Sequence, residues 1–203
     1  MKEIKDTVYS SDGTVQVLTQ GGTELERKFS RTMPDGSPAA ARYTGIMPPC
    51  TVDREPFLNK CTRCGKCIEV CPQHILHPAE EDELGPLGKG APAVSFENGW
   101  CLRYCNRCAE VCPTGAINLR SLAEKADDRL GWATFNRLTC VTQTDDVDCN
   151  ACIRHCPTHA ISVQEFNGHK IPKIRISQCI GCGACEFYCP ARPKAIHVEG
   201  LKY

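Results

Sequence analysis

The chain has 203 residues, with 24 basic and 24 acidic side chains and 17 cysteines. The balanced charge and the lack of a basic run argue against a nucleic-acid-binding protein, and no apolar stretch approaches the roughly 20 residues of a membrane-spanning helix. Cysteine supplies much of the apolar fraction, so the hydrophobic core is small. We therefore expect bound metal to be coupled to folding, and the metal-free chain to be largely unfolded.

Residues 1–49 form a polar extension with several turn-forming sequences, in which Thr14–Thr19 has the pattern of a short strand. The extension has too few apolar residues for a core of its own, so we expect it to lie over the rest of the chain or over a partner. Met1–Thr7 has neither an apolar signal segment nor a twin-arginine motif. A cytoplasmic location is therefore expected.

The first cysteine run is Cys61, Cys64, Cys67 and Cys71, followed by Pro72. This is the C-x2-C-x2-C-x3-C-P spacing that binds a cubane iron–sulfur cluster, because a short turning segment aims three thiolates into one cavity. In two-cluster ferredoxins the fourth cysteine binds the other cluster, so one run implies a partner run. Just before the first run, Asp53–Asn59 is predicted to form a helix that starts at Asp53 and brings Phe57 and Leu58 next to the first cluster.

Three more runs follow, each closed by a Cys-Pro pair. The second run is Cys101, Cys105, Cys108 and Cys112, the third is Cys140, Cys149, Cys152 and Cys156, and the fourth is Cys179, Cys182, Cys185 and Cys189. The fourth run repeats the spacing of the first, whereas the first cysteine is displaced in the second and third. Such repetition identifies the unit of construction. Only Cys50 is left over, and we expect it to be a buried or free thiol rather than a ligand.

The segments between the runs predict short helices and strands. Leu119–Leu130 is predicted to be a helix capped by Ser121, with Leu122, Ala126 and Leu130 on one face. The expected strands are Ala93–Phe96, Trp132–Phe135, and a hairpin of Ile161–Val163 with Lys173–Ile176 around Asn167–Gly168. His155 and His159 flank Cys156, but the run already offers four thiols, so we interpret both histidines as ordinary packing residues.

Two other chemistries could use many cysteines. A disulfide framework is typical of short secreted chains with a signal peptide. Structural zinc uses paired C-x2-C arms, and it does not require a third cysteine at the same spacing and a fourth before proline, repeated four times. The pattern therefore favours four [4Fe–4S] clusters.

A family resemblance rests on the order of the four runs and on details between them. Cys112–Ile117 is followed by Ala126–Gly131, the third run has its distant Cys140, and the last run is followed by Ala195–Ile196. In these features residues 47–200 resemble the NapG/MauM ferredoxin-type polyferredoxins. The resemblance implies an electron-carrying subunit with four [4Fe–4S] clusters and no catalytic residues. The expected fold is α+β, with dicluster ferredoxin modules in tandem or nested order behind the polar extension.

By resemblance to related four-cluster subunits, the first run is expected to pair with the fourth and to enclose the pair formed by the second and third. The domains are then an extension, residues 1–49, and a ferredoxin region, residues 50–203, in which residues 50–98 with 164–203 form an outer module and residues 99–163 an inner one. The expected cluster ligands are Cys61, Cys64, Cys67 with Cys189; Cys179, Cys182, Cys185 with Cys71; Cys101, Cys105, Cys108 with Cys156; and Cys140, Cys149, Cys152 with Cys112. Sequential pairing, first with second and third with fourth, is the alternative.

The function expected from this resemblance is the relay of single electrons to or from a partner oxidoreductase. The implied partners are a catalytic subunit of the molybdenum or tungsten pterin type and a second redox protein, and higher-order assembly is also open. No phosphate-binding glycine loop, nucleophile with a base or flavin motif indicates catalysis by the chain itself. The alternative function is an iron–sulfur maturation or assembly factor for a redox enzyme.

Overall fold

The computed structural model describes residues 4–9, 14–19, 25–28 and 44–201. The chain divides into two compact units, Met1–Arg42 and Tyr43–Tyr203. The second unit begins earlier than the ferredoxin region expected at residue 50, because Ile46 and Met47 are buried in its core. Ile46 also forms a β-bridge with Val94.

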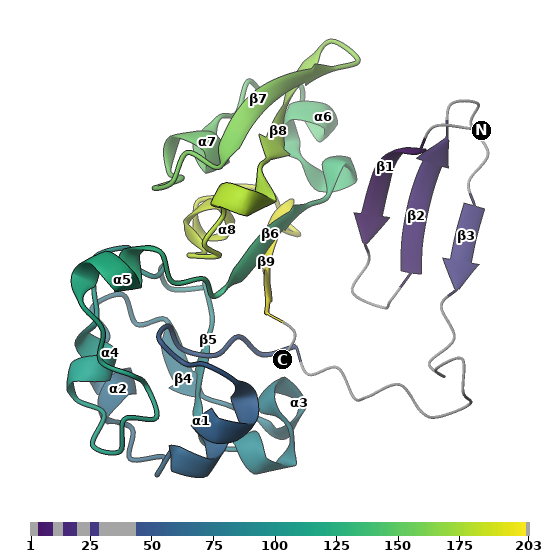
Figure 1. Ribbon diagram of the computed structural model, residues 1–203. Helices are drawn as coiled ribbons and strands as arrows, with labels where there is room; N and C mark the ends of the chain where they lie inside the picture. Colours follow the sequence, from purple (N-terminus) through teal and green to yellow (C-terminus); the bar gives the residue numbers. More distant parts are fainter. Residues whose placement is uncertain (1–3, 10–13, 20–24, 29–43, 202–203) are drawn as a thin grey trace. The chain divides into compact units, whose positions relative to one another are not determined.

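The first unit contains an antiparallel three-stranded sheet in the order β1-β2-β3 (Figure 1). Its strands are β1 (Ile4–Tyr9), β2 (Thr14–Thr19) and β3 (Leu25–Lys28). The strand predicted at Thr14–Thr19 is therefore confirmed.

The second unit is built from short helices and two-stranded sheets (Figure 1). Around the first and second runs lie α1 (Arg54–Lys60), α2 (Lys66–Glu69), β4 (Leu76–Pro78), α3 (Glu81–Leu84), the 3-10 helix η1 (Pro86–Gly88), β5 (Pro92–Val94) and α4 (Arg107–Glu110). The antiparallel pair β4–β5 brackets the segment that separates the two runs. Helix α1 confirms the predicted helix, with Asp53 at its N-cap position and Phe57 and Leu58 buried.

The same plan continues around the third and fourth runs. There the elements are α5 (Leu122–Ala126), β6 (Gly131–Phe135), η2 (Arg137–Thr139), α6 (Val141–Thr144), α7 (Ala151–Arg154), β7 (Ile161–Phe166), β8 (His169–Ile174), η3 (Ile176–Gln178), α8 (Ala184–Phe187) and β9 (Ile196–Gly200). The hairpin β7–β8 turns at Asn167 and Gly168, which both have positive φ angles, as predicted. Strand β6 confirms the strand predicted before Cys140, and its antiparallel partner is β9.

A one-turn helix occurs in each run, over the third cysteine: α2, α4, α7 and α8 in chain order. In the first and fourth runs a glycine in the left-handed region, Gly65 or Gly183, precedes this turn, and glycine adopts that conformation at little cost. In the second and third runs the same place is taken by Asn106 and Asn150, whose φ angles are −128° and −122°. The backbone thus enters the turn differently in the two runs whose first cysteine is displaced.

Helix α5 differs from the prediction in length and in its buried face. Ser121 caps it as expected, accepting a hydrogen bond from the Glu124 N–H at 3.3 Å. The helix ends at Ala126, however, so Leu130 does not continue its face, and Leu122 is exposed. The side chains that α5 buries are Lys125 and Ala126.

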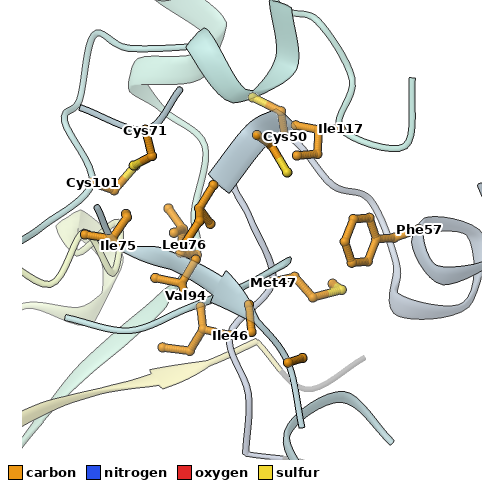
Figure 2. Close-up of a cluster of buried hydrophobic side chains, with 14 of the residues drawn as sticks. Ile46, Met47, Cys50, Phe57, Cys71, Ile75, Leu76, Val94, Cys101 and Ile117 are labelled. Carbon is orange, nitrogen blue, oxygen red and sulfur yellow. The ribbon is translucent and has the colours of Figure 1, made fainter. Parts of the chain in front are cut away.

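Two hydrophobic clusters form the core of the second unit. The first gathers Ile46, Met47, Phe57, Ile75, Leu76, Val94 and Ile117 (Figure 2) around Cys50, cysteines of the first two runs and Cys182 of the fourth. The second gathers Ala133, Ile161 and Ile196 around cysteines of the last two. Because the cysteines are themselves part of both clusters, the core and the candidate metal sites occupy the same space.

Candidate iron–sulfur sites

The first three cysteines of the first run share a cavity with the last cysteine of the second run. Cys61, Cys64, Cys67 and Cys112 all line it. Phe57, Ile68, Val111 and Ile117 supply its apolar wall. Helix α2, which contains Cys67, contacts α4, which ends two residues before Cys112. We call this group of four thiols site I.

The reciprocal arrangement forms a second cavity. Cys101, Cys105 and Cys108 of the second run line it together with Cys71 of the first run. Figure 2 shows the side chains of Cys71 and Cys101 next to each other. These four thiols are site II, and sites I and II make up the first module.

The third and fourth runs also lie against each other, since α7 contacts α8, and their thiols can be grouped by their neighbours. Burial, followed by the neighbouring thiols of Cys140, Cys149 and Cys189, raises the pKa of Cys152 to about 12. We call these four cysteines site III. Burial raises the pKa of Cys182 to about 11, and Cys156 and Cys179 are its neighbouring thiols; burial and the neighbouring Cys182 and Cys179 likewise raise the pKa of Cys185, with Cys156 also contributing. These four form site IV, and sites III and IV make up the second module.

This grouping differs from the nested pairing expected from the resemblance and favours the sequential alternative. Cys112, and not Cys189, shares the cavity of Cys61, Cys64 and Cys67, and Cys71 lies with the second run rather than the fourth. The physical reason is local. The segment between Cys71 and Cys101 folds back through the β4–β5 pair and brings the second run against the first. The outer and inner modules expected at residues 50–98 with 164–203 and at 99–163 therefore do not match the cysteine groups, which follow the sequential alternative.

Hydrogen bonds to sulfur prepare several of these cysteines to be thiolates. Backbone N–H groups donate to the sulfur of the last cysteine of a run at Cys112 (from Ile117, 3.5 Å), Cys156 (from Ala160, 3.3 Å) and Cys189 (from Ala195, 3.4 Å). The Ala133 N–H of β6 donates to Cys179 at 3.4 Å. Such bonds orient metal ligands and tune the electronic properties of the metal group, so the donor set fits a thiolate-bound cluster.

Threonine hydroxyls add to these contacts. Thr114 and Thr158, each two residues after the last cysteine of its run, lie 3.8 and 3.6 Å from the sulfurs of Cys112 and Cys156. The buried Thr142 lies closer, 3.1 Å from the sulfur of Cys140. The sequence analysis missed all three, although the repeated Cys-Pro-Thr of the second and third runs was a usable signal.

Each of the four sites contains at least one thiol whose pKa is raised by burial, so that it favours the protonated form when no metal is bound. Burial raises the pKa of Cys67 to about 11 and of Cys101 to about 12. Cys112 behaves in the opposite way, because hydrogen bonds from Ile117 and Thr114 outweigh its burial and lower its pKa. A metal group must therefore displace protons from these raised-pKa thiols, which couples its binding to pH.

The quartets of sites I and II each border a cavity rather than a single point. Over the described part of the chain, no three His, Cys, Asp or Glu side chains come close enough to hold a single metal ion. Structural zinc needs all its ligands at about 2.0–2.3 Å from one ion. An apolar cavity edged by four thiols from two runs instead suits the larger iron–sulfur core.

Two other predictions concern residues beside the runs. Cys50 is confirmed as a buried thiol, and its N–H donates to the carboxylate of Asp128. The ring of His155 stacks on Tyr188 with 3.5 Å between centroids, in keeping with a packing role. His159 is exposed. No helix in the part of the chain that the structure describes has both the length and the apolar character to cross a membrane.

Two modules, each with two cysteine quartets over a mixture of short helices and hairpins, define a ferredoxin-type electron carrier with four [4Fe–4S] clusters. The comparison with protein families agrees. The family described as "4Fe-4S dicluster domain" matches residues 60–116 and 147–192, which together make up just over half of the chain. The first match spans the first and second runs, and the second spans all of the fourth run and most of the third, in the sequential order of the two modules.

Similar proteins from several bacteria narrow the class. The chain is 33% identical to the methylamine utilization ferredoxin-type protein MauM of Methylophilus methylotrophus over 188 residues, covering 88% of this chain and 80% of the relative. It is 32% identical to the MauM of Paracoccus denitrificans, with 96% and 86% covered, and 32% identical to the ferredoxin-type protein NapF of Escherichia coli K12, with 77% and 86% covered. The chain belongs to this MauM/NapF-like family of ferredoxin-type proteins, which confirms the resemblance expected from the sequence.

Proposed function

We propose that the chain relays single electrons through its four clusters, between a partner oxidoreductase and a second redox protein. The observation that supports this most directly is the junction of the two modules. The N–H of Cys101 at site II donates to the carbonyl of Cys182 at site IV at 2.8 Å. Both residues are buried, so one buried peptide hydrogen bond joins the two sites.

Each quartet is proposed to hold one cluster, which when bound accepts and releases one electron. The proposed ligands are those of sites I to IV: Cys61, Cys64, Cys67, Cys112; Cys101, Cys105, Cys108, Cys71; Cys140, Cys149, Cys152, Cys189; and Cys179, Cys182, Cys185, Cys156. Sites I and II adjoin within the first module, sites II and IV across the junction, and sites IV and III within the second. This favours a linear order I–II–IV–III.

Aromatic side chains reinforce the junction between sites II and IV. Trp100, directly before Cys101, packs against Phe187 and Tyr188 of the fourth run, with ring centroids 5.4 and 5.1 Å apart. These contacts help to fix the position of one module on the other. The chain's own contribution to electron transfer is thus to hold sites II and IV close together.

Site I is the better candidate for an entry or exit point, because Cys64 is the one exposed cysteine among the four proposed sites. The partner class follows the sequence resemblance, which implies an oxidoreductase of the molybdenum or tungsten pterin type. The printed name of MauM connects that relative with methylamine utilization, and a different enzyme could serve here.

The test begins with anaerobic isolation of the chain from its native source together with bound polypeptides. The relay predicts four reducible clusters per chain, a catalytic subunit in stoichiometric amount, and oxidation of the reduced clusters when that enzyme's electron acceptor is added. Substitution Cys182→Ser at the inner site IV should slow this transfer at least tenfold. If instead the chain binds only cluster-free enzyme and is released once clusters are loaded, the maturation factor is the correct function.

A further inference from the structure

Lys125 is a buried cation that the electron relay described above does not use. Its side chain is 1% exposed, and among the described residues Thr142 is the only other buried polar or charged side chain. Lysine is almost never buried to this degree without a partner. Its position therefore calls for an anion.

Two hydrogen bonds hold the segment around Lys125 against the second run. The guanidinium of Arg103 donates to the carbonyl of Ala126 at 3.2 Å, and the amide of Asn106 donates to the carbonyl of Arg120 at 3.1 Å. Since α5 buries only Lys125 and Ala126, the face that carries Lys125 is the one turned toward site II.

The carboxylates nearby are engaged with other groups. Asp128 pairs with Arg120 at 3.2 Å and accepts the N–H of Cys50. Asp127 lies 3.7 Å from Arg103 and is exposed, and Glu124 accepts from Ser121. Over the described residues no hydrogen bond or ion pair joins the ammonium of Lys125 to a carboxylate.

A buried ammonium without an anion is strongly unfavourable. Site II offers the missing anion, because a cubane with four thiolates carries net negative charge and the core adjoins Cys101. Accepting an electron makes that charge more negative, so a fixed positive charge stabilises the reduced state more than the oxidised one. In a buried, weakly screened place the effect is large, and nearby charge is one of the factors that set cluster potentials.

We propose that Lys125 is the built-in countercharge of site II and holds its reduction potential above those of sites I, III and IV. This inference rests on the proposed relay and on its cluster assignment. No other buried cation occurs among the described residues, so the remaining sites lack an equivalent. The cluster at site II, next to the junction between the modules, is therefore the first to be reduced.

The test is a redox titration of the anaerobic holoprotein with dithionite and ferricyanide, followed by electron paramagnetic resonance. In the wild type the first cluster reduced should be the one whose signal is altered by Cys105→Ser. In Lys125→Met, which keeps the unbranched stem and loses the charge, the reduced-to-oxidised ratio of that cluster at fixed potential should fall at least tenfold, a shift of 59 mV. The other three clusters should change less than threefold, and Lys125→Arg should behave like the wild type.

Lys66→Met is the matched control, because this lysine precedes the site I cysteine Cys67 but is exposed. Solvent screening predicts less than a threefold change at site I. Unchanged potentials in Lys125→Met would overturn the countercharge and leave the relay intact. Absence of four reducible clusters in the wild type would instead overturn the relay. Should Lys125→Met fail to load iron, Lys125→Gln titrated in the same way decides between these results.

Discussion

Sites I and IV are built around runs of the same spacing, yet their surroundings are opposite. Both runs place a glycine with positive φ, Gly65 at 75° and Gly183 at 80°, between the second and third cysteines. At site I an added Cβ on Gly65 would meet nothing within 4 Å, and Cys64 is exposed. At site IV an added Cβ on Gly183 would lie 2.0 Å from the ring of Phe96, and Cys179, Cys182 and Cys185 are all buried.

The difference teaches that spacing encodes the local ligand loop, whereas packing between the modules decides how a site can be used. Phe96 belongs to the first module's core and closes over the glycine of the second. Site IV is therefore an interior site. Site I keeps one thiol at the surface, where a partner protein can approach.

Removing the iron is expected to have the largest effect, because it should unfold both sites and so remove the difference between them. The core clusters contain the cysteines themselves, so a metal-free chain retains little apolar contact and must bury protonated thiols in place of the cluster. We expect chelated, reduced protein to lose the secondary structure of residues 44–201 in far-ultraviolet circular dichroism. A native-like spectrum of iron-free protein would show that chain packing alone holds the sites.

Removing single ligands tests which cysteine completes each site. Cys112→Ser should disturb the same cluster as Cys64→Ser, and Cys156→Ser the same cluster as Cys182→Ser, with one cluster of four lost or altered in each. Electron paramagnetic resonance of the reduced variants, with iron analysis, identifies the cluster. If Cys189→Ser instead disturbed the same cluster as Cys64→Ser, Cys189 would complete site I and the nested pairing would be correct.

Alanine at the two glycines sharpens the contrast between the open and the packed loop. The left-handed conformation costs alanine about 1–2 kcal/mol at either position. Gly183→Ala adds overpacking against Phe96, about 1–3 kcal/mol more, because that ring is itself buried. Gly183→Ala should therefore be clearly less stable than Gly65→Ala. The measurement is thermal or denaturant unfolding of the holoprotein, or its rate of cluster loss when unfolding is irreversible.

The double variant Gly183→Ala with Phe96→Ala is the control for this overlap. Truncating the ring makes room for the new methyl group, so the two substitutions should cost less together than the sum of their separate effects. Strict additivity would mean that the ring and the glycine do not meet, and that site IV is less enclosed than described.

The sequence could predict the ligand loops and the elements that depend on local pattern, but not the packing between them. The run spacings, the Asn167–Gly168 hairpin and the cap at Ser121 are fixed by neighbouring residues. The partner of each run, the pairing of β6 with β9 and the closure of Phe96 over Gly183 depend on contacts between distant segments. The same holds for α5, where a helical period placed Leu122 inside, while the early end at Ala126 and the anchoring by Arg103 bury Lys125 instead.

The smallest expected effect comes from the hydroxyl at site III. Thr142 is buried and lies 3.1 Å from the sulfur of Cys140, whereas Thr114 at site I is 3.8 Å from Cys112 and exposed. Valine fills the same volume without a donor, so Thr142→Val should destabilise the reduced, more negative state by about 0.5–1.5 kcal/mol, the net value of one hydrogen bond. That corresponds to a potential about 20–60 mV lower.

Thr114→Val is the matched control, with a smaller shift expected because water can replace its hydroxyl. Redox titration of both variants measures the two shifts under the same conditions. A larger shift for Thr114→Val would mean that exposure, and not the hydrogen bond to sulfur, governs how these sites respond. In that case the difference between a surface site and an interior one would be a difference of solvent access alone.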